Sequence, residues 1–173
     1  MSTIIIITGG RNTGKTTMAY ALCSLLDLDG KSIGGVIQVL ALPGQSKDMY
    51  ELSSQADGSS LVMLSSQKRD SWQAVGNFYY NPETEKWAEK QFRASYTSDV
   101  IVFDEIGRYE LAGRGFDESF RYAVDSYEGI VLIVIREENI ASVCDRYGVD
   151  IDSCVIIRSQ DDTKQAYTRI QNL

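Results

Sequence analysis

The chain has 173 residues, of which 43% are hydrophobic, and its 17 Lys and Arg against 24 Asp and Glu give a net charge of -7. This length and composition predict a single domain, residues 1–173, with one sizeable core. The acidic balance argues against nucleic-acid binding, which depends on many Lys and Arg contacts to phosphate, but it permits one local phosphate pocket.

The histidine and cysteine content excludes some kinds of metal and catalytic site. The sequence has no histidine, which excludes histidine-based metal sites and triads, and its cysteines, Cys23, Cys144 and Cys154, form no CxxC pair. Their apolar surroundings favour buried, reduced thiols. The apolar start is too short for a signal peptide and lacks a basic leader, and no run approaches the roughly 18 apolar residues of a membrane span. We therefore expect a cytoplasmic protein with no membrane partner.

The predicted elements alternate between strands and helices. Ile4–Ile7 is a continuous β-branched run, typical of a strand covered on both faces, and Met18–Leu26 carries apolar residues at helical spacing. Further apolar runs predict strands at Gly35–Leu40, Val100–Phe103, Ile130–Ile135 and Val155–Ile157. Helical spacing recurs at Phe116–Tyr127, Ile140–Tyr147 and Ala166–Ile170. This alternation predicts an α/β fold in three layers, with a mostly parallel central sheet between helices.

Residues 41–81 interrupt the alternation. Short strand-like pieces at Met49–Leu52, Leu61–Leu64 and Phe78–Tyr80 alternate there with turns rich in Gly, Ser, Asp and Gln. This pattern predicts a small antiparallel β-rich insertion on the parallel sheet. The sequence Asn81-Pro82-Glu83 then favours the start of a helix, because Asn caps, Pro suits the first position and Glu faces the positive end of the helix dipole.

The segment TGGRNTGKTT follows the first predicted strand and contains the pattern GxxxxGK[ST], the P-loop. Its glycines let backbone N–H groups wrap a phosphate, and the next helix directs its positive end to the same place. We expect Lys15 to reach the β- and γ-phosphates and the Thr16 hydroxyl to bind Mg²⁺. The predicted nucleotide-binding residues are Gly9, Gly10, Arg11, Asn12, Thr13, Gly14, Lys15, Thr16 and Thr17. An accidental match in a Gly-rich turn is the alternative, but the strand before and the helix after favour a P-loop.

An acidic pair ends another predicted strand. In DVIVFDEIG, Asp104 directly follows Val100–Phe103, where a carboxylate is able to hold Mg²⁺ directly or through water. Glu105 is next to it, and a glutamate at this position polarises the attacking water in one large division of P-loop proteins. The alternatives are that Asp104 is a turn residue and that Glu105 is a solvated residue at the start of a loop.

The segment DEIGRYEL, taken with TGGRNTGKTT and AVGNFYYNPETEKWAEKQF, resembles the THEP-type nucleoside triphosphatases, from the N-terminus to about Ile157. The resemblance implies Mg²⁺-dependent hydrolysis of ATP, GTP and related triphosphates on a RecA-like sheet. It also gives Asp104 the metal role and Glu105 the water-activating role, and it places Glu110 in the family's acidic pair as a further catalytic candidate. Arg11-Asn12 replaces the family's usual Pro-Gly and Tyr109 its usual methionine, which is consistent with a divergent subgroup.

Two arginines are candidates because of their places in such a sheet. If the order is RecA-like, Ile130–Ile135 lies between the P-loop strand and the Asp104 strand, and Arg136 points toward the γ-phosphate as a sensor or arginine finger. The alternative for Arg136 is a solvent-facing residue that opens the next helix. Arg158-Ser159 follow the last strand, where P-loop folds often place the base, so Arg158 is a candidate nucleotide contact.

Three functional hypotheses follow from these residues. The first is a nucleoside triphosphatase that uses water as the acceptor, favoured by Asp104-Glu105 and by the family resemblance. The second is a kinase that transfers the γ-phosphoryl group to a small molecule or nucleotide, with residues 41–81 as the acceptor site. The third is a nucleotide-binding switch or accessory protein, in which the bound nucleotide orders the insertion for a protein partner. Phosphate release with and without acceptors discriminates among them.

Overall fold

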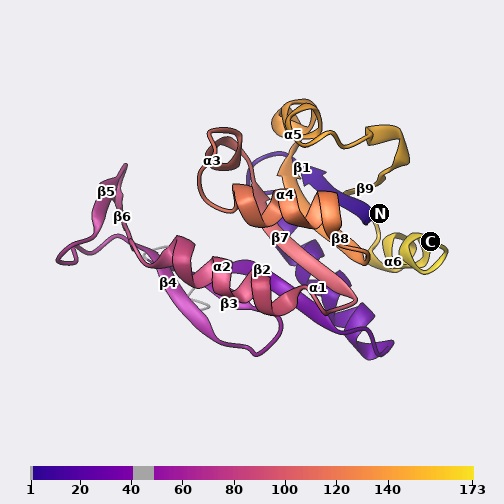
Figure 1. Cartoon of the computed structure of the whole chain (residues 1–173), viewed down its shortest axis with the longest axis horizontal. Coiled ribbons are helices and arrows are strands. Elements are labelled where there is room, and N and C mark those ends of the chain that lie inside the picture. Colours follow the sequence, from indigo (N-terminus) through magenta and orange to yellow (C-terminus); the bar gives the residue numbers. More distant parts are fainter. Residues whose placement is uncertain (1, 41–48) are drawn as a thin grey trace.

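A computed structural model describes residues 2–40 and 49–173, and one mixed sheet forms the centre of this part of the protein (Figure 1). The strand order is β5-β6-β4-β3-β2-β7-β8-β1-β9. The strands are β1 (Thr3–Gly9), β2 (Ile33–Leu40), β3 (Met49–Ser54), β4 (Ser60–Ser65), β5 (Gln73–Val75), β6 (Phe78–Tyr80), β7 (Val100–Ile106), β8 (Ile130–Arg136) and β9 (Val155–Arg158). The helices are α1 (Lys15–Leu28), α2 (Thr84–Ser95), α3 (Arg108–Leu111), α4 (Asp117–Ser126), α5 (Ile140–Tyr147) and α6 (Thr163–Gln171), with 3-10 turns η1 (Glu137–Asn139) and η2 (Ile151–Ser153).

One half of the sheet is parallel. Strands β2, β7, β8, β1 and β9 pair side by side in the same direction, so their carboxyl ends lie at one edge. Strand β8 lies between β7 and β1, as the RecA-like order predicts, and Gly9 is opposite Arg136 in the β1–β8 register. The predicted α/β P-loop fold is therefore confirmed. Because the strands are parallel, the ends of β1, β7, β8 and β9 bring residues distant in sequence to one place.

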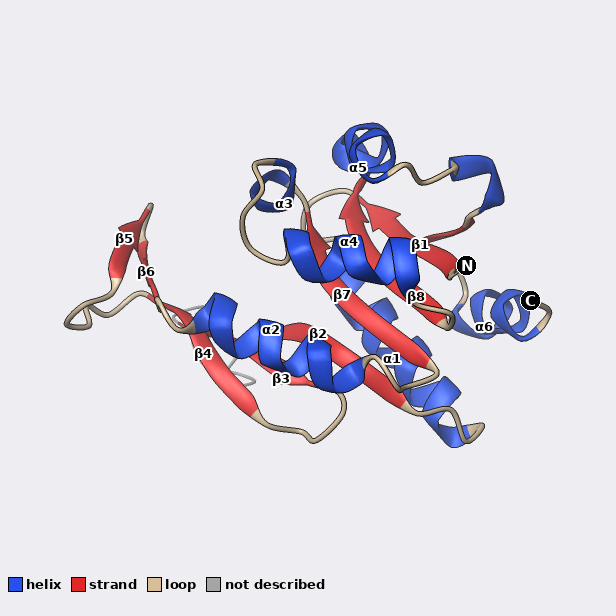
Figure 2. Cartoon of the chain, in the orientation of Figure 1, coloured by secondary structure: helices blue, strands red, loops and turns tan. Residues whose placement is uncertain are grey.

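Helices cover both faces of the parallel strands (Figure 2). Alternate residues of β1 point to opposite faces, as the period of a strand requires. Ile5 and Ile7 pack with α1 and α6, whereas Ile6 joins the core beneath α2, α4 and α5. Both faces of the central strands are thus buried, which explains why their sequences are continuous apolar runs.

The other half of the sheet, residues 49–80, is called the antiparallel wing below. Strands β3, β4, β6 and β5 pair antiparallel, and β3 joins β2 with Val36 opposite Ser54, so the wing extends the central sheet. The predicted strand pieces are confirmed, and β5 is an additional strand that the sequence pattern did not indicate. Residues 41–48 of the predicted insertion lie outside the described residues. The β5–β6 hairpin projects from the body at the left of Figure 1.

The junction between the wing and α2 is held by Asn81. Its Oδ1 accepts a hydrogen bond from Glu83 N at 3.0 Å, and its Nδ2 donates to the carbonyl oxygen of Val62 at 2.8 Å. The helix begins at Thr84, slightly later than the sequence pattern indicates, with Glu83 and not Asn81 at the N-cap position. Asn81 therefore fastens the start of α2 to the sheet.

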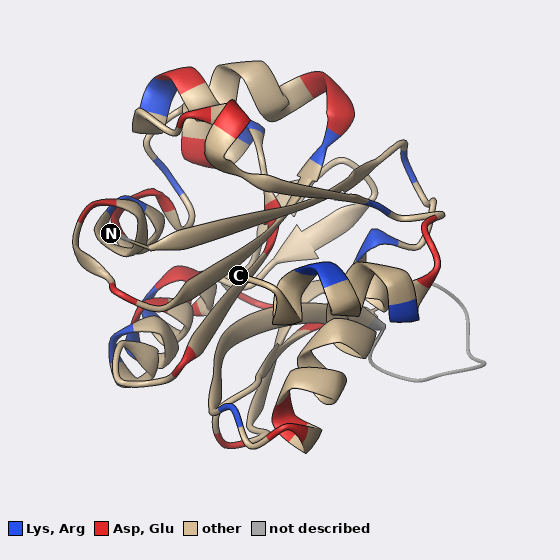
Figure 3. Cartoon of the chain, turned by 90° about the vertical axis from the view of Figure 1, so that its right-hand side faces the viewer, with Lys and Arg blue, Asp and Glu red and all other residues tan. Residues whose placement is uncertain are grey.

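Charged residues of both signs lie mainly on helices and loops, and the central strands are largely uncharged (Figure 3). The exceptions of interest are at strand ends: Asp104 and Glu105 on β7, Arg136 on β8 and Arg158 on β9. In the described part of the chain, none of the helices has the length and apolar character needed to cross a membrane.

Candidate active site

The loop between β1 and α1 has the backbone of a phosphate cradle. Gly9 has φ +153° and Gly14 has φ +89°, and Asn12 is also in the left-handed region at φ 57°. A Cβ on Gly9 would lie 2.5 Å from Ser159 Oγ, so only glycine fits there. Gly14 caps α1, and among the described residues no side chain caps this end by a hydrogen bond. The free N–H groups at the start of α1 are therefore available to an anion.

Lys15 folds back over this loop. Its side chain is buried, and Nζ donates a hydrogen bond to the carbonyl oxygen of Gly10 at 2.7 Å. Because the ammonium group is held inside the cradle, a phosphate that enters meets a cation already in place.

Thr16 and Asp104 form the next layer of the site. The Thr16 hydroxyl donates to the Asp104 carboxylate, 3.1 Å from Oδ2 and 3.3 Å from Oδ1, and Gln38 N donates to Oδ2 at 3.0 Å. Asp104 is 2% exposed, and this burial raises the pKa of its carboxyl to about 7 against the effect of the two donors. A buried carboxylate beside a hydroxyl is a hard-oxygen donor pair that suits Mg²⁺.

This donor set is small, as expected for a metal shared with a nucleotide. Among residues 2–40 and 49–173, no three His, Cys, Asp or Glu side chains gather into a group able to hold a metal alone. Mg²⁺ usually keeps several waters and binds one or two carboxylates together with substrate phosphates, so Thr16 and Asp104 fit this ion.

Glu105 is turned out of the strand by an irregularity in β7. The register between β7 and β8 shifts between Phe103 and Ile106, and Glu105 has φ 64° in the left-handed region. Such a bulge re-aims a side chain, and a strained non-glycine residue of this kind costs on the order of 1 kcal/mol. The side chain of Glu105 is 37% exposed, and its carboxylate lies 3.4 Å from Arg136 NH2. The structure thus brings together two of the predicted catalytic residues.

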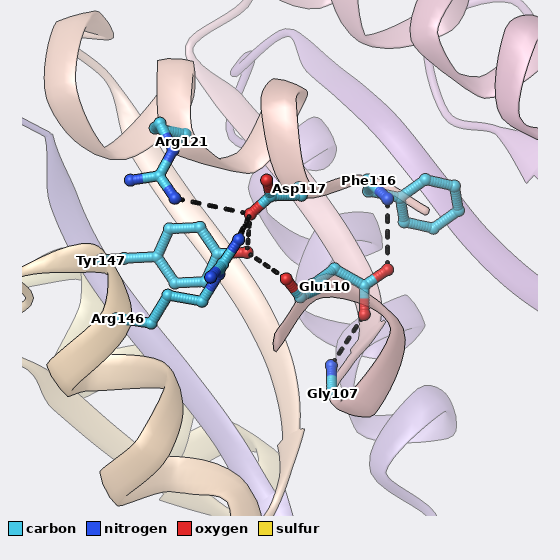
Figure 4. Close-up of polar contacts among 7 residues, drawn as sticks. All are labelled: Gly107, Glu110, Phe116, Asp117, Arg121, Arg146 and Tyr147. Atoms are coloured by element: carbon cyan, nitrogen blue, oxygen red, sulfur yellow. Dashed lines mark hydrogen bonds and ion pairs between the residues drawn. The ribbon is translucent and has the colours of Figure 1, made fainter. Parts of the chain in front are cut away.

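Glu110 faces in another direction. Its side chain is buried, and its two carboxylate oxygens accept hydrogen bonds from Gly107 N at 2.9 Å and Phe116 N at 3.2 Å (Figure 4). Burial raises the pKa of the Glu110 carboxyl, although both backbone donors favour its ionised form. These bonds bind each carboxylate oxygen of Glu110 to a backbone N–H group of the segment between β7 and α4.

The end of β9 touches the loop through Ser159. Ser159 Oγ donates to Thr13 Oγ1 at 2.8 Å, and Thr13 Oγ1 donates to the carbonyl oxygen of Gly10 at 3.0 Å. Arg158 points elsewhere, because its exposed guanidinium pairs with Glu137 at 3.2 Å. The remaining predicted contacts of the loop, Arg11, Asn12 and Thr17, are exposed.

Comparison with known proteins decides the family. A family model described as NTPase matches residues 4–165, which is most of the chain. The chain belongs to this NTPase family. The predicted resemblance to THEP-type nucleoside triphosphatases is therefore confirmed.

Relatives in the NTPase family include proteins named "Nucleoside-triphosphatase THEP1" from two archaea. The one from Methanopyrus kandleri is 25% identical over 131 residues, covering 75% of this chain and 72% of its own length. The one from Methanothermobacter thermautotrophicus is 28% identical over 174 residues, covering 98% of this chain and 94% of its own length.

Two solved structures share the fold. A crystal structure of THEP1 from Aquifex aeolicus superposes with a TM-score of 0.71 at 20% identity, over 96% of both chains. The solution structure of a human cancer-related nucleoside triphosphatase gives a TM-score of 0.74 at 17% identity, over 99% of this chain and 96% of its own. At these identities the likeness concerns the arrangement of the elements.

Two contributors to the site of this NTPase-family protein escaped the sequence analysis. Gln38 acts through its backbone N–H, which no sequence motif encodes, and the position of Ser159 after the last strand predicts only that it lies near the base. The register of β2 beside β7 is what brings Gln38 to Asp104. A separate cavity of about 580 Å³, lined by Lys31, Tyr96 and Tyr122 among others, lies at the opposite edge of the sheet and takes no part in this site.

Proposed function

We propose that the protein hydrolyses nucleoside triphosphates of the ATP and GTP type to a nucleoside diphosphate and phosphate, with Mg²⁺ as cofactor. Membership of the NTPase family and the names of its relatives support triphosphate hydrolysis. The observation that carries the finer proposal is the Thr16–Asp104 pair next to Glu105, which lies at the register shift of β7 and pairs with Arg136.

The P-loop binds the phosphates. We expect backbone N–H groups between Gly9 and Thr16 to contact the phosphates, and the start of α1, where no described side chain caps the helix, adds its positive dipole end. Lys15 exchanges its bond to the Gly10 carbonyl for one to the β- and γ-phosphates, which offer charged acceptors and thus stronger hydrogen bonds.

Thr16 and Asp104 would hold the metal. Both present oxygen atoms, and the buried Asp104 carboxylate gains a counter-charge when a divalent cation enters. When bound, Mg²⁺ neutralises charge on the β- and γ-phosphates as the terminal phosphoryl group is transferred.

Glu105 accepts the proton of the attacking water. The water oxygen forms a bond to the γ-phosphorus, and the bond from that phosphorus to the β,γ-bridging oxygen breaks, so that the nucleoside diphosphate leaves. The water proton passes to the Glu105 carboxylate. Arg136 orients this carboxylate from 3.4 Å away and supplies positive charge at the end of β8. Water activation is assigned to Glu105 because the carboxylate oxygens of Glu110 are both bound to backbone N–H groups.

Phosphate release from Mg·ATP and Mg·GTP tests the proposal. Glu105→Gln keeps the size of the side chain but cannot accept the proton, so kcat should fall by about 10²–10⁴ while Mg·nucleotide binding persists. Lys15→Ala should weaken binding itself, and EDTA should stop turnover. The matched control is Glu138→Gln, which removes the same charge from an exposed residue of η1. This variant should hydrolyse triphosphates like the wild type.

Three results would contradict the proposal. Glu105→Gln with wild-type turnover would remove the water-activating role. Transfer of phosphate to an added small molecule in preference to water would indicate a kinase. Tight triphosphate binding with no hydrolysis by the wild type would indicate a nucleotide switch.

A further inference from the structure

The segment between Glu105 and α4 needs support from other parts of the protein. Gly113 and Gly115 have φ values of 72° and 61°, in the left-handed region, so the backbone turns sharply there. A Cβ on Gly115 would lie 2.4 Å from Glu110 Oε1, which shows how closely the carboxylate packs against this backbone. A loop with such turns keeps one conformation only if buried groups hold it.

Glu110 joins the two ends of this loop. Its Oε2 binds Gly107 N, just after the bulge of β7, and its Oε1 binds Phe116 N, just before α4. The two donors bind different carboxylate oxygens, so a glutamine here would turn its amide nitrogen toward one backbone N–H and lose that bond. Of these two side chains, glutamate is the one that satisfies both ends of the loop.

A second cluster, here called the Asp117 cluster, fixes the same loop to α5 (Figure 4). Asp117 Oδ1 accepts hydrogen bonds from Arg146 NH2 at 2.9 Å and from the Tyr147 hydroxyl at 2.6 Å, and Arg121 NH2 is 3.6 Å away. The Tyr147 hydroxyl also lies 3.3 Å from the carbonyl oxygen of Glu110. Tyr147 therefore touches both the loop and the first residue of α4.

These contacts connect the two strand ends that carry the proposed catalytic pair. The loop held by Glu110 follows Glu105 on β7, and α5, which carries Arg146 and Tyr147, follows Arg136 on β8 through η1. The Asp117 cluster thus connects the segments that follow Glu105 and Arg136. This connection is additional to the pairing of β7 with β8, which places the two strand ends side by side.

We propose that Glu110 and the Asp117 cluster are positioning residues that set the Glu105–Arg136 geometry for turnover. The inference rests on the proposed hydrolysis, and these residues act through Glu105 without touching the nucleotide. A small displacement of a catalytic group lowers the rate of the chemical step much more than it lowers substrate binding. The expected signature is a lower kcat with little change in KM.

Steady-state hydrolysis of Mg·ATP by Tyr147→Phe and Glu110→Gln tests the inference. Tyr147→Phe removes a single hydroxyl and should lower kcat about 3–10-fold, and Glu110→Gln, which frees one end of the loop, should lower it about 10–100-fold. KM should stay within about twofold in both cases. Glu110→Gln should also raise amide hydrogen exchange at Gly107 and Phe116, whose N–H groups the carboxylate binds in the wild type.

Matched controls separate positioning from charge and stability. Glu118→Gln removes an exposed carboxylate in the first turn of α4, and Tyr122→Phe removes an exposed hydroxyl from the same helix. Both should keep wild-type kcat when assayed well below the melting temperature of every variant.

The outcomes distinguish this inference from the proposed function. If the wild type hydrolyses ATP but folded Tyr147→Phe and Glu110→Gln keep its kcat, the positioning role is overturned alone. An increase in KM without loss of kcat overturns it too, because it would indicate a binding role. A wild type without hydrolysis overturns the proposed function and, with it, this inference.

Discussion

The parallel half of the sheet and the antiparallel wing differ in how they are covered. In β7 and β8 nearly every residue is buried between helices, whereas β5 is exposed along its length and β6 is only half-buried. The predicted site residues all belong to the covered half, at the ends of strands, in the loops that follow them, or in the helices α1 and α3 that come next. Strands held on both faces keep their ends in fixed positions, which a site that depends on exact distances requires. No predicted site residue in the wing needs such a fixed position, and binding of an acceptor or a protein partner there stays a prediction.

The largest expected effect compares one phenylalanine from each half. Phe103 on β7 is fully buried, stacks on Phe92 at 4.2 Å and meets Phe120 edge-on, so Phe103→Ala should lower the free energy of unfolding by about 3–5 kcal/mol. Phe78 on β6 is only partly buried against Tyr50, and Phe78→Ala should cost about 1 kcal/mol. Urea unfolding measures both values. Equal losses would mean that the wing is as tightly packed as the centre.

A smaller effect concerns the cost of burying Asp104 in the covered half. Because burial raises the pKa of Asp104 to about 7, its contribution to stability is full below the unfolded-state pKa of about 4 and is lost as pH rises through about 7. Without metal or nucleotide, Asp104→Asn should therefore raise the melting temperature more at pH 8 than at pH 4. In the Mg²⁺-dependent assay the same variant should lose turnover.

Asp99 is the control, because its pKa is shifted in the opposite direction. Hydrogen bonds from the Ser32 hydroxyl and backbone lower the pKa of Asp99, so its contribution is present above the unfolded-state pKa and is lost as pH falls. Asp99→Asn should lower the melting temperature at pH 8 and matter less near pH 3. If both variants shift the melting temperature in the same direction at pH 8, burial is not what distinguishes Asp104.

The smallest expected effect is at Ser159, where the edge strand β9 meets the P-loop. Ser159→Ala removes the hydrogen bond to Thr13 and should weaken Mg·ATP binding about 2–10-fold, the worth of one hydrogen bond. Because the contact supports the phosphate loop, inorganic tripolyphosphate should lose affinity by the same factor in a calorimetric titration. A loss confined to ATP would place Ser159 at the base, and Ser24→Ala on the exposed face of α1 should change neither affinity.

Local patterns explain which parts of the fold were predictable. The strand of Ile4–Ile7, the glycine loop and the following helix occupy adjacent positions, so periodicity and glycine spacing were enough to predict them. The place of β8 between β7 and β1 was predicted by family resemblance and is confirmed. The exposed β5 was not predicted because Gln73–Val75, unlike the equally short Phe78–Tyr80, has no aromatic residues of the kind enriched in strands.

The candidate site also has some features that the sequence determines and others that depend on the tertiary structure. The sequence by itself determined the P-loop motif and the two carboxylates at the end of a buried strand, because these chemical groups are encoded in short runs. Only the tertiary structure decided which glutamate is free: Glu105 is turned out by a bulge to meet Arg136, and Glu110 is bound by Gly107 and Phe116. It also brought the backbone of Gln38 to Asp104. These assignments depend on strand register and on backbone donors, which every residue except proline carries and which therefore leave no trace in the sequence.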